Sequence, residues 1–185
     1  MDDSLLIKAC KKQDRDAQQE LYEKYAKKMM AVCLRYSNSR ETASDLLHDG
    51  FIQVFTHIRS FEGTGSFEGW MRRIFVNLAL ANYRKEQKEG GTKIDLEQIE
   101  SEPAEEEMDD DYFALHKITR EELIDLIRAL PTGYRTIFNL FVFEDKSHKE
   151  IAKMLGISEA SSRSQYSRAK AWLKKKINAI IEKRK

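Results

Sequence analysis

Apolar residues recur at steps of three and four along most of this chain, the spacing that aligns side chains on one face of an α-helix. No region sustains the alternation of a half-buried strand, and only 2 prolines occur. The pattern predicts an all-α protein made of two small helical bundles. The expected helices span residues 4–11, 14–36, 38–58, 67–88, 119–130, 134–143, 148–155 and 159–181.

The apolar stripes of the first four expected helices indicate which side chains pack inward. The first helix presents Leu5, Leu6 and Ala9, and the second presents Ala17, Leu21, Tyr25, Met29, Val32 and Tyr36. The third presents Ala43, Leu47, Phe51, Val54, Phe55 and Ile58, and the fourth presents Trp70, Ile74, Leu78 and Ala81. A glycine-bearing loop at residues 60–66 separates the third helix from the fourth.

The stretch SHKEIAKMLGISEASSRSQYSRAK, residues 147–170, carries the strongest local signals. Ser147 and Glu150 have the spacing of a capping box, which predicts a helix start. Gly156 ends that helix, because glycine adopts a left-handed cap without steric cost. Ser158 is a favourable N-cap for a second helix. Two short helices joined by a tight glycine turn are typical of a helix-turn-helix.

The second helix of this motif has a polar outward face. Tyr166, Ala169 and Leu173 point inward by their spacing, and so does Ser162, where an aliphatic residue is expected. The outward residues are Glu159, Ala160, Ser161, Arg163, Ser164, Gln165, Ser167 and Arg168. Base edges are read by donors and acceptors, and phosphates by Lys or Arg, so this face favours DNA recognition. An ordinary helical hairpin with a solvated face is the alternative interpretation.

Charge is distributed unevenly although the net charge is only +1. Residues 1–85 carry +3, residues 86–116 carry −10 and residues 117–185 carry +8. The basic C-terminal part suits a polyanion, whereas the acidic part does not. The acidic stretch is also short of aromatic residues, which is typical of a linker. We therefore expect domains at residues 1–88 and 117–185, joined by a flexible acidic linker at residues 89–116.

Composition excludes several other classes of function. No run approaches the ~18 apolar residues of a membrane span, and the polar N-terminus is not that of a signal peptide. Cys10 and Cys33 are isolated, as expected for reduced thiols in the cytoplasm. Neither the histidines nor the acidic run at residues 109–111 has a convincing ligand spacing. We expect no catalytic residues, no metal and no cofactor.

Three segments, in this order, resemble those of the extracytoplasmic-function (ECF) group of bacterial RNA polymerase sigma factors. DLLHDGFIQVFTHI (45–58) is similar to the helix of that family that binds RNA polymerase core. SFEGWMRRIFVNLALANYRK (66–85) is similar to the segment that reads and opens the minus-ten element. LPTGYRTIFNLFVFEDKSHKEIAKMLGIS (130–158), followed by SRAK, is similar to the minus-thirty-five reader. The resemblance extends from about residue 5 to residue 173, except for the linker.

The resemblance implies a non-enzymatic sigma factor that binds the β′ clamp of RNA polymerase core, directs it to promoter DNA and promotes DNA opening. It implies an anti-sigma factor as a further partner, no stable membrane insertion and a cytoplasmic location. Residues 1–88 would then be the region 2-like domain and residues 117–185 the region 4-like domain. Because opening needs no nucleotide hydrolysis in this family, the missing phosphate-binding loop agrees with that interpretation.

The resemblance and the helical geometry together assign candidate residues to three contacts. Core polymerase would be bound by Asp45, Leu46, His48, Asp49 and Gln53, on a mixed outer face of the third helix. The minus-ten DNA would be held by Phe61, Arg72, Arg73, Asn77, Arg84 and Lys85. The minus-thirty-five DNA would be held by Lys149, Ser158, Glu159, Ser161, Arg163, Ser164, Gln165, Arg168 and Lys170. Trp70 has the character of a melting wedge, but its place in an apolar stripe favours core packing.

Three rival functions remain open at this point. A conventional transcription regulator would use residues 1–85 for sensing or dimerisation and would bind DNA without polymerase. A helical metal-dependent nuclease would need clustered carboxylates on folded helices, whereas the acids cluster in the linker. An anti-sigma-type interaction protein would not need a recognition helix.

Overall fold

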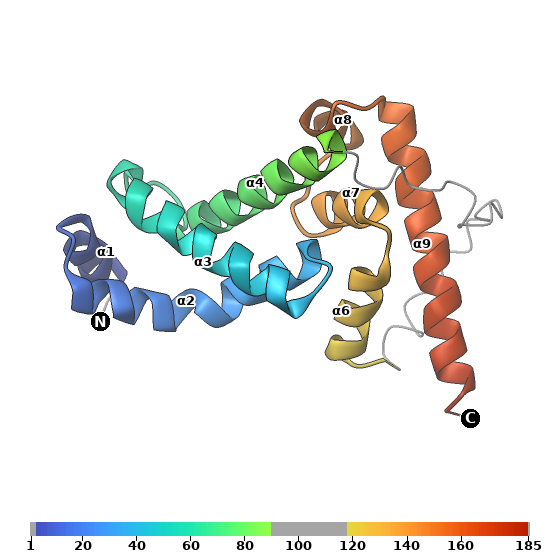
Figure 1. The fold of residues 1–185 in the computed structure, drawn as a ribbon, viewed down its shortest axis with the longest axis horizontal. Helices are drawn as coiled ribbons and strands as arrows, with labels where there is room; N and C mark the ends of the chain where they lie inside the picture. The colour runs from blue at the N-terminus through green and yellow to red at the C-terminus, as the bar shows by residue number, and fades with distance from the viewer. Residues whose placement is uncertain (1–2, 90–117, 185) are drawn as a thin grey trace. The chain divides into compact units, whose positions relative to one another are not determined.

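The computed structural model describes residues 3–89 and 118–184, and these residues form helices and no strand, so the all-α prediction is confirmed. Apart from residue 89, the expected linker lies outside the described residues. The helices are α1 (Asp3–Lys11), α2 (Arg15–Tyr36), α3 (Arg40–His57), α4 (Phe67–Lys88), α6 (Arg120–Ala129), α7 (Thr132–Val142), α8 (His148–Leu155) and α9 (Glu159–Glu182), with a 3-10 turn at Ile58–Ser60 after α3 (Figure 1).

Side-chain caps start most of these helices where the sequence predicts. Asp14 caps α2 by accepting a hydrogen bond from the Ala17 amide at 3.0 Å, and Thr119 and Glu122 form the capping box of α6. α3 begins two residues later than the predicted helix over 38–58. Its capping box is Ser39 with Thr42, whose hydroxyl and amide groups satisfy each other.

The chain divides into two compact units, and the boundary lies between Asn82 and Tyr83, within α4. In the first unit α2 packs against both α1 and α3. α4 packs against α3 through aromatic side chains, since the buried Phe75 ring lies edge-on to Phe51 at 5.5 Å and directly over Gly50. A Cβ atom at Gly50 would lie 2.0 Å from the Phe75 ring, so this close approach depends on glycine.

The inward face of α4 differs from the predicted stripe. The buried residues are Phe67, Met71, Phe75, Val76, Ala79 and Leu80. Trp70, Ile74 and Leu78 are only half-buried and Ala81 is exposed, so the predicted stripe is wrong by about one residue of rotation. Apolar side chains occupy two adjoining sides of this helix, and contact with Phe51 of α3 and Phe61 of the preceding loop accompanies burial of the side that carries Phe67 and Phe75.

The first helix also turns a different face inward. Leu6, Ile7 and Cys10 are buried, whereas the expected core residue Leu5 is 57% exposed. In α2 the predictions for Ala17, Leu21, Tyr25, Met29 and Val32 are confirmed, because all of these are buried. The stripe of α2 therefore predicts burial correctly, whereas those of α1 and α4 do not.

The second unit, which begins at Tyr83, contains the bundle of α6, α7, α8 and α9. Its core contains Ile127, Leu130, Tyr134, Ala169 and Leu173, with Leu123, Leu126, Phe138, Phe143 and Trp172 packed around them. α9 contacts α6, α7 and α8, so the long C-terminal helix organises the bundle. Among the residues the structure describes, no helix has the length and apolar content needed to cross a membrane.

Candidate nucleic-acid interface

The helix-turn-helix is built from the local signals that the sequence contains. The Ser147 amide donates to the Glu150 carboxylate at 2.9 Å, and this hydrogen bond holds the pKa of Glu150 below its usual value. Gly156 adopts a φ of +69°, and the following Ile157 amide donates to the Ala152 carbonyl at 3.1 Å. Ser158 then caps α9. The capping box, the glycine turn and the second cap are therefore all confirmed.

The outward face of α9 is accessible along its first three turns. All nine residues predicted to contact minus-thirty-five DNA are exposed or half-buried, and none lies in the core. Arg163 pairs with Glu159 one turn earlier, so the first turn presents an ion pair as well as hydroxyls. The hydroxyl groups of Ser158 and Ser161 are 2.9 Å apart. This surface offers donors, acceptors and cations side by side, the groups needed at base edges and phosphates.

Ser162 is fully buried beneath this face, which confirms its inward orientation. Its hydroxyl lies 2.9 Å from Nδ1 of His148, the first residue of α8. The sequence reveals the unusual serine but not its partner, because the two residues are fourteen positions apart and meet only across the turn.

The outer face of α3 presents most of the residues predicted to bind core polymerase. Asp45, His48, Asp49 and Gln53 are exposed, and Gln53 is 3.1 Å from His57 one turn later. The placement of Leu46 on this face is wrong, because its side chain is only 5% exposed and packs inside with its neighbours. The buried stripe of α3 is two residues wide in its middle, where Leu46 pairs with Leu47 and Gly50 with Phe51, and it continues at Val54.

An apolar residue that the sequence analysis missed does lie on this outer face. Ile52 is 60% exposed, one of three large apolar side chains among the described residues that are so open to solvent. It stands one turn after His48 and Asp49, and it lines a shallow hollow with Gln18, Phe55 and Arg59, among others. By helical spacing Ile52 lies away from the wide buried stripe of α3, and this separation is the sequence signal that could have identified it.

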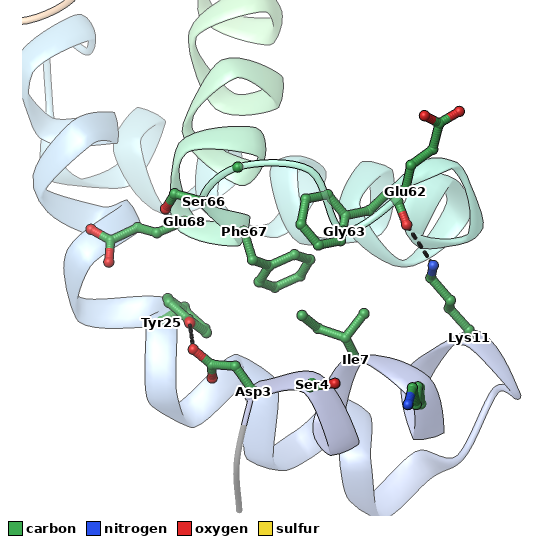
Figure 2. A pocket seen from close by; sticks show the side chains of 13 residues that line it. Asp3, Ser4, Ile7, Lys11, Tyr25, Glu62, Gly63, Ser66, Phe67 and Glu68 are labelled. Carbon is green, nitrogen blue, oxygen red and sulfur yellow. Dashed lines mark hydrogen bonds between the residues drawn. The ribbon is translucent and has the colours of Figure 1, made fainter.

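The loop after α3 encloses a hollow of about 500 Å³ on the surface of the first unit. Figure 2 shows its walls, which come from α1, α2, the loop and the start of α4. The Lys11 ammonium donates to the carbonyl of Phe61 and ties the loop to α1. Across the hollow, the Tyr25 hydroxyl donates to Asp3 at 2.9 Å. Hydrogen bonds from Lys24 and Tyr25 lower the pKa of Asp3.

Phe61 lies in the wall of this hollow and not on the open surface. Its side chain is 7% exposed and contacts Phe67 and Trp70, with ring centroids 5.1 and 5.6 Å away. Trp70 stacks on Phe67 at an interplanar angle of 19°, and it is half-buried. Any base that stacks on Phe61 must therefore enter the hollow.

The polar residues predicted to hold minus-ten DNA follow along α4. Arg73, Asn77 and Arg84 are exposed and fall on one side of the helix, since they are separated by four and then seven residues. Arg72 is half-buried on an adjoining side. Lys85 is exposed and lies 3.9 Å from Glu89, a loose pair in solvent. In the described part of the chain, no group of three or more potential metal-ligating side chains occurs.

Comparison with known proteins agrees with this arrangement. Residues 21–89 match the model of sigma-70 region 2, and residues 120–173 match that of sigma-70 region 4. The ECF RNA polymerase sigma-E factor of Haemophilus influenzae is 28% identical over 97% of each chain. ECF sigma factor SigW of Bacillus subtilis is 26% identical over 94% of this chain and 96% of its own. The chain belongs to the ECF group of sigma factors.

A structural neighbour is the sigma factor RpoE from Bartonella quintana in complex with the anti-sigma factor NepR, with 17% identity, a TM-score of 0.48 and coverage of 85% and 94% of the two chains. As an ECF sigma factor, the protein directs RNA polymerase core to promoters and promotes DNA opening for transcription initiation. The region 2 match contains every residue predicted for core and minus-ten contacts, and the region 4 match contains every residue predicted for minus-thirty-five contacts. α1 lies outside both matches.

Proposed function

We propose that this sigma factor divides its task among three surfaces. The outer face of α3 docks on the β′ clamp, the hollow and polar side of α4 hold the minus-ten strand, and α9 reads the minus-thirty-five element. The observation that carries the proposal is the two-sided character of the helix-turn-helix, in which Ser162, Ala169 and Leu173 of α9 are buried while all nine predicted DNA contacts are accessible. The factor would supply binding energy and no catalytic group.

The two promoter-binding domains gain from being in one chain. Each alone would bind weakly, and the second contact becomes intramolecular once the first is made. Residues 89–116 would serve as the acidic tether, and their charge keeps them off DNA. Replacing their carboxylates by the corresponding amides and measuring initiation tests the charge separately from the length.

Minus-ten opening would proceed by capture of the displaced strand. Unstacking one step of duplex DNA costs about 1.4 kcal/mol, so a base held in the hollow and phosphates held by α4 must offset that cost. The aromatic wall is suited to hold the base, while Lys8 and Lys11 offset part of the negative charge of Asp3, Glu62 and Glu68, which also line the hollow. Initiation would then need no nucleotide hydrolysis for opening.

The decisive experiment is run-off transcription by purified core polymerase on a broad pool of promoters, with and without this protein. We expect transcripts from a small subset of templates only when the protein is present. Identical transcript sets in both reactions would refute the proposed function.

The role of α9 is tested by replacing Arg163 and Arg168 with alanine. Removing one cation from a phosphate reduces the dependence of log affinity on log salt by about 0.9. Holoenzyme carrying both changes should therefore bind its promoter more weakly and with a flatter salt dependence. Arg120→Ala removes an exposed arginine from the same unit and should leave both unchanged. An unaltered slope in the double variant would exclude α9 as the reader.

The role of α3 is tested at the exposed apolar residue. Ile52→Ala should weaken binding to core polymerase about tenfold or more, because full burial of such a side chain contributes ~1.5–3 kcal/mol. Asp49→Lys should weaken it by charge reversal. Leu5→Ala is the matched control, since Leu5 is similarly exposed but lies on α1, outside the region 2 match. Equal affinities for the Ile52 and Leu5 variants would contradict this docking face.

Two further parts of the proposal follow from the family. We propose that an anti-sigma factor covers the polymerase- or promoter-binding surfaces of this chain, and that the protein acts in the cytoplasm, where bacterial polymerase and DNA are found. Co-purification of the tagged protein from its host, followed by identification of bound chains, tests the first. Fractionation of the same cells tests the second.

A further inference from the structure

A buried polar contact joins the two helices of the helix-turn-helix. His148 begins α8, and its Nδ1 lies 2.9 Å from the hydroxyl of Ser162, a residue of α9 with no exposed surface. The hydroxyl stands between Ser161 and Arg163, two of the residues proposed to reach DNA. α8 and α9 pack against each other and Ile151 of α8 is buried, so this bond adds a directional link where the two helices meet.

Aromatic rings hold the imidazole in place. The ring of His148 stacks on Phe141 of α7, with centroids 4.6 Å apart and an interplanar angle of 18°. Tyr166 of α9 lies on another side at 5.6 Å, and it also contacts Phe141 at 4.4 Å. Contacts with α7 and α9, together with its place on α8, therefore fix the position of the His148 ring. They also fix the direction from which the ring meets Ser162.

The charged and titratable groups facing His148 are on α9. They are Arg163, which opposes a positive imidazolium, Glu159, which favours one, and the Tyr166 hydroxyl. α7 contributes only the uncharged ring of Phe141. Burial lowers the pKa of His148 below 6.5, and Arg163 adds to this effect. A stacked ring attracts a cation, but desolvation is the larger effect, so the neutral imidazole is favoured at neutral pH.

We propose that His148 is a positioning residue for minus-thirty-five recognition, which sets the first turns of α9 through its hydrogen bond to Ser162, and that a positive charge on its ring, beside Arg163 and away from water, disturbs this arrangement. This inference rests on the proposed role of α9. The mechanism is geometric: Ser162 cannot shift without moving Ser161 and Arg163, its neighbours on the same turn. A misplacement of about 1 Å in such a contact degrades recognition strongly.

The test compares holoenzymes on a responsive promoter and on the same promoter with a scrambled minus-thirty-five element, and the ratio of the two affinities measures discrimination. His148→Phe and Ser162→Ala should each reduce this ratio about fivefold, the effect of one hydrogen bond. The double variant should lose no more than either single one, because both remove the same bond. His148→Asn, which keeps a hydrogen-bonding group near Nδ1, should recover most of the discrimination.

A pH series separates positioning from simple stability. Wild-type discrimination should fall only when the pH drops below the ordinary imidazole value and reaches the lowered pKa of His148, whereas that of His148→Asn should stay level, because asparagine does not titrate. His57→Asn, which changes an exposed histidine on α3, should keep the wild-type profile. In a Trp70→Phe background, Trp172 fluorescence should show that the second unit stays folded in every variant over this range.

The outcomes distinguish this inference from the proposed function. Wild-type holoenzyme that ignores the scrambled element would overturn both, because positioning presupposes reading. Two results would overturn the inference alone if the wild-type holoenzyme discriminates. One is unchanged discrimination in both His148→Phe and Ser162→Ala. The other is additive losses in the double variant together with a pH profile that His148→Asn shares.

Discussion

The contact between Gly50 of α3 and Phe75 of α4 yields a sharp prediction, because two known effects oppose each other there. In an ordinary helix interior, glycine to alanine stabilises by about 1 kcal/mol. At Gly50 the new Cβ would lie 2.0, 2.4 and 2.5 Å from three atoms of the Phe75 ring. Carbon atoms prefer about 3.5–4.0 Å, so the ring or the helix must move by well over 1 Å.

The steric effect should dominate. Phe75 is fully buried and packs edge-on against Phe51, so its ring has no free space to enter. Overpacking of this kind costs about 1–3 kcal/mol, and we expect Gly50→Ala to destabilise the first unit by about 2 kcal/mol net. Phe75→Leu removes two of the three obstructing ring atoms, including the nearest one. In that background, Gly50→Ala should be neutral or stabilising, which gives a coupling energy of about 2–3 kcal/mol.

Urea unfolding of the full chain measures this. The chain has 2 tryptophans, one in each unit, so a Trp172→Phe background leaves Trp70 as the reporter of the first unit. Gly69→Ala is the matched control, because a Cβ there meets Ser66 at an ordinary 3.6 Å. It should be neutral or stabilising by up to about 1 kcal/mol. Stabilisation by Gly50→Ala equal to that of Gly69→Ala would refute the packing of α4 on α3.

Three further predictions concern caps and thiols. Ser147→Ala removes the cap of α8 and should cost about 1 kcal/mol, measured by Trp172 fluorescence in urea. Gly156→Ala meets no neighbouring atom, so its expected cost of about 1 kcal/mol in the same assay comes from the positive φ alone. Burial raises the pKa of Cys10 to about 11 and that of Cys33 to about 12. At pH 8 both thiols should stay protonated and resist alkylation until urea is added, as mass spectrometry would show.

The features predicted correctly from sequence are those determined by short-range chemistry. The capping box at Ser147 joins groups three residues apart, and the turn at Gly156 needs only one residue with a positive φ. Such signals are complete within a few residues. The helix-turn-helix was therefore predictable in detail, including the inward orientation of Ser162.

Features that depend on a distant partner were not predictable. Nothing near Gly50 reveals that a phenylalanine twenty-five residues later lies over it. The choice between the Trp70 and Met71 sides of α4 depends in the same way on the rings that α3 and the loop present. The hydrogen bond between His148 and Ser162 is a third example, because it forms only once the turn brings α8 against α9.

Errors in the core become errors in the site, since an interface residue is identified as one that the core does not use. On α9 the N-cap Ser158 and the turn before it set the rotational phase of the helix, so its outward face was assigned correctly. α3 also has an N-cap, but no tight turn like the one before α9 joins it to a neighbouring helix. Its buried stripe is two residues wide. Leu46 was consequently assigned to the polymerase face and Ile52 was overlooked, although the exposed side chain belongs to Ile52. Exchanging the two assignments leaves an apolar centre, Ile52, within a polar rim of Asp45, His48, Asp49 and Gln53, which is the usual anatomy of a protein–protein interface.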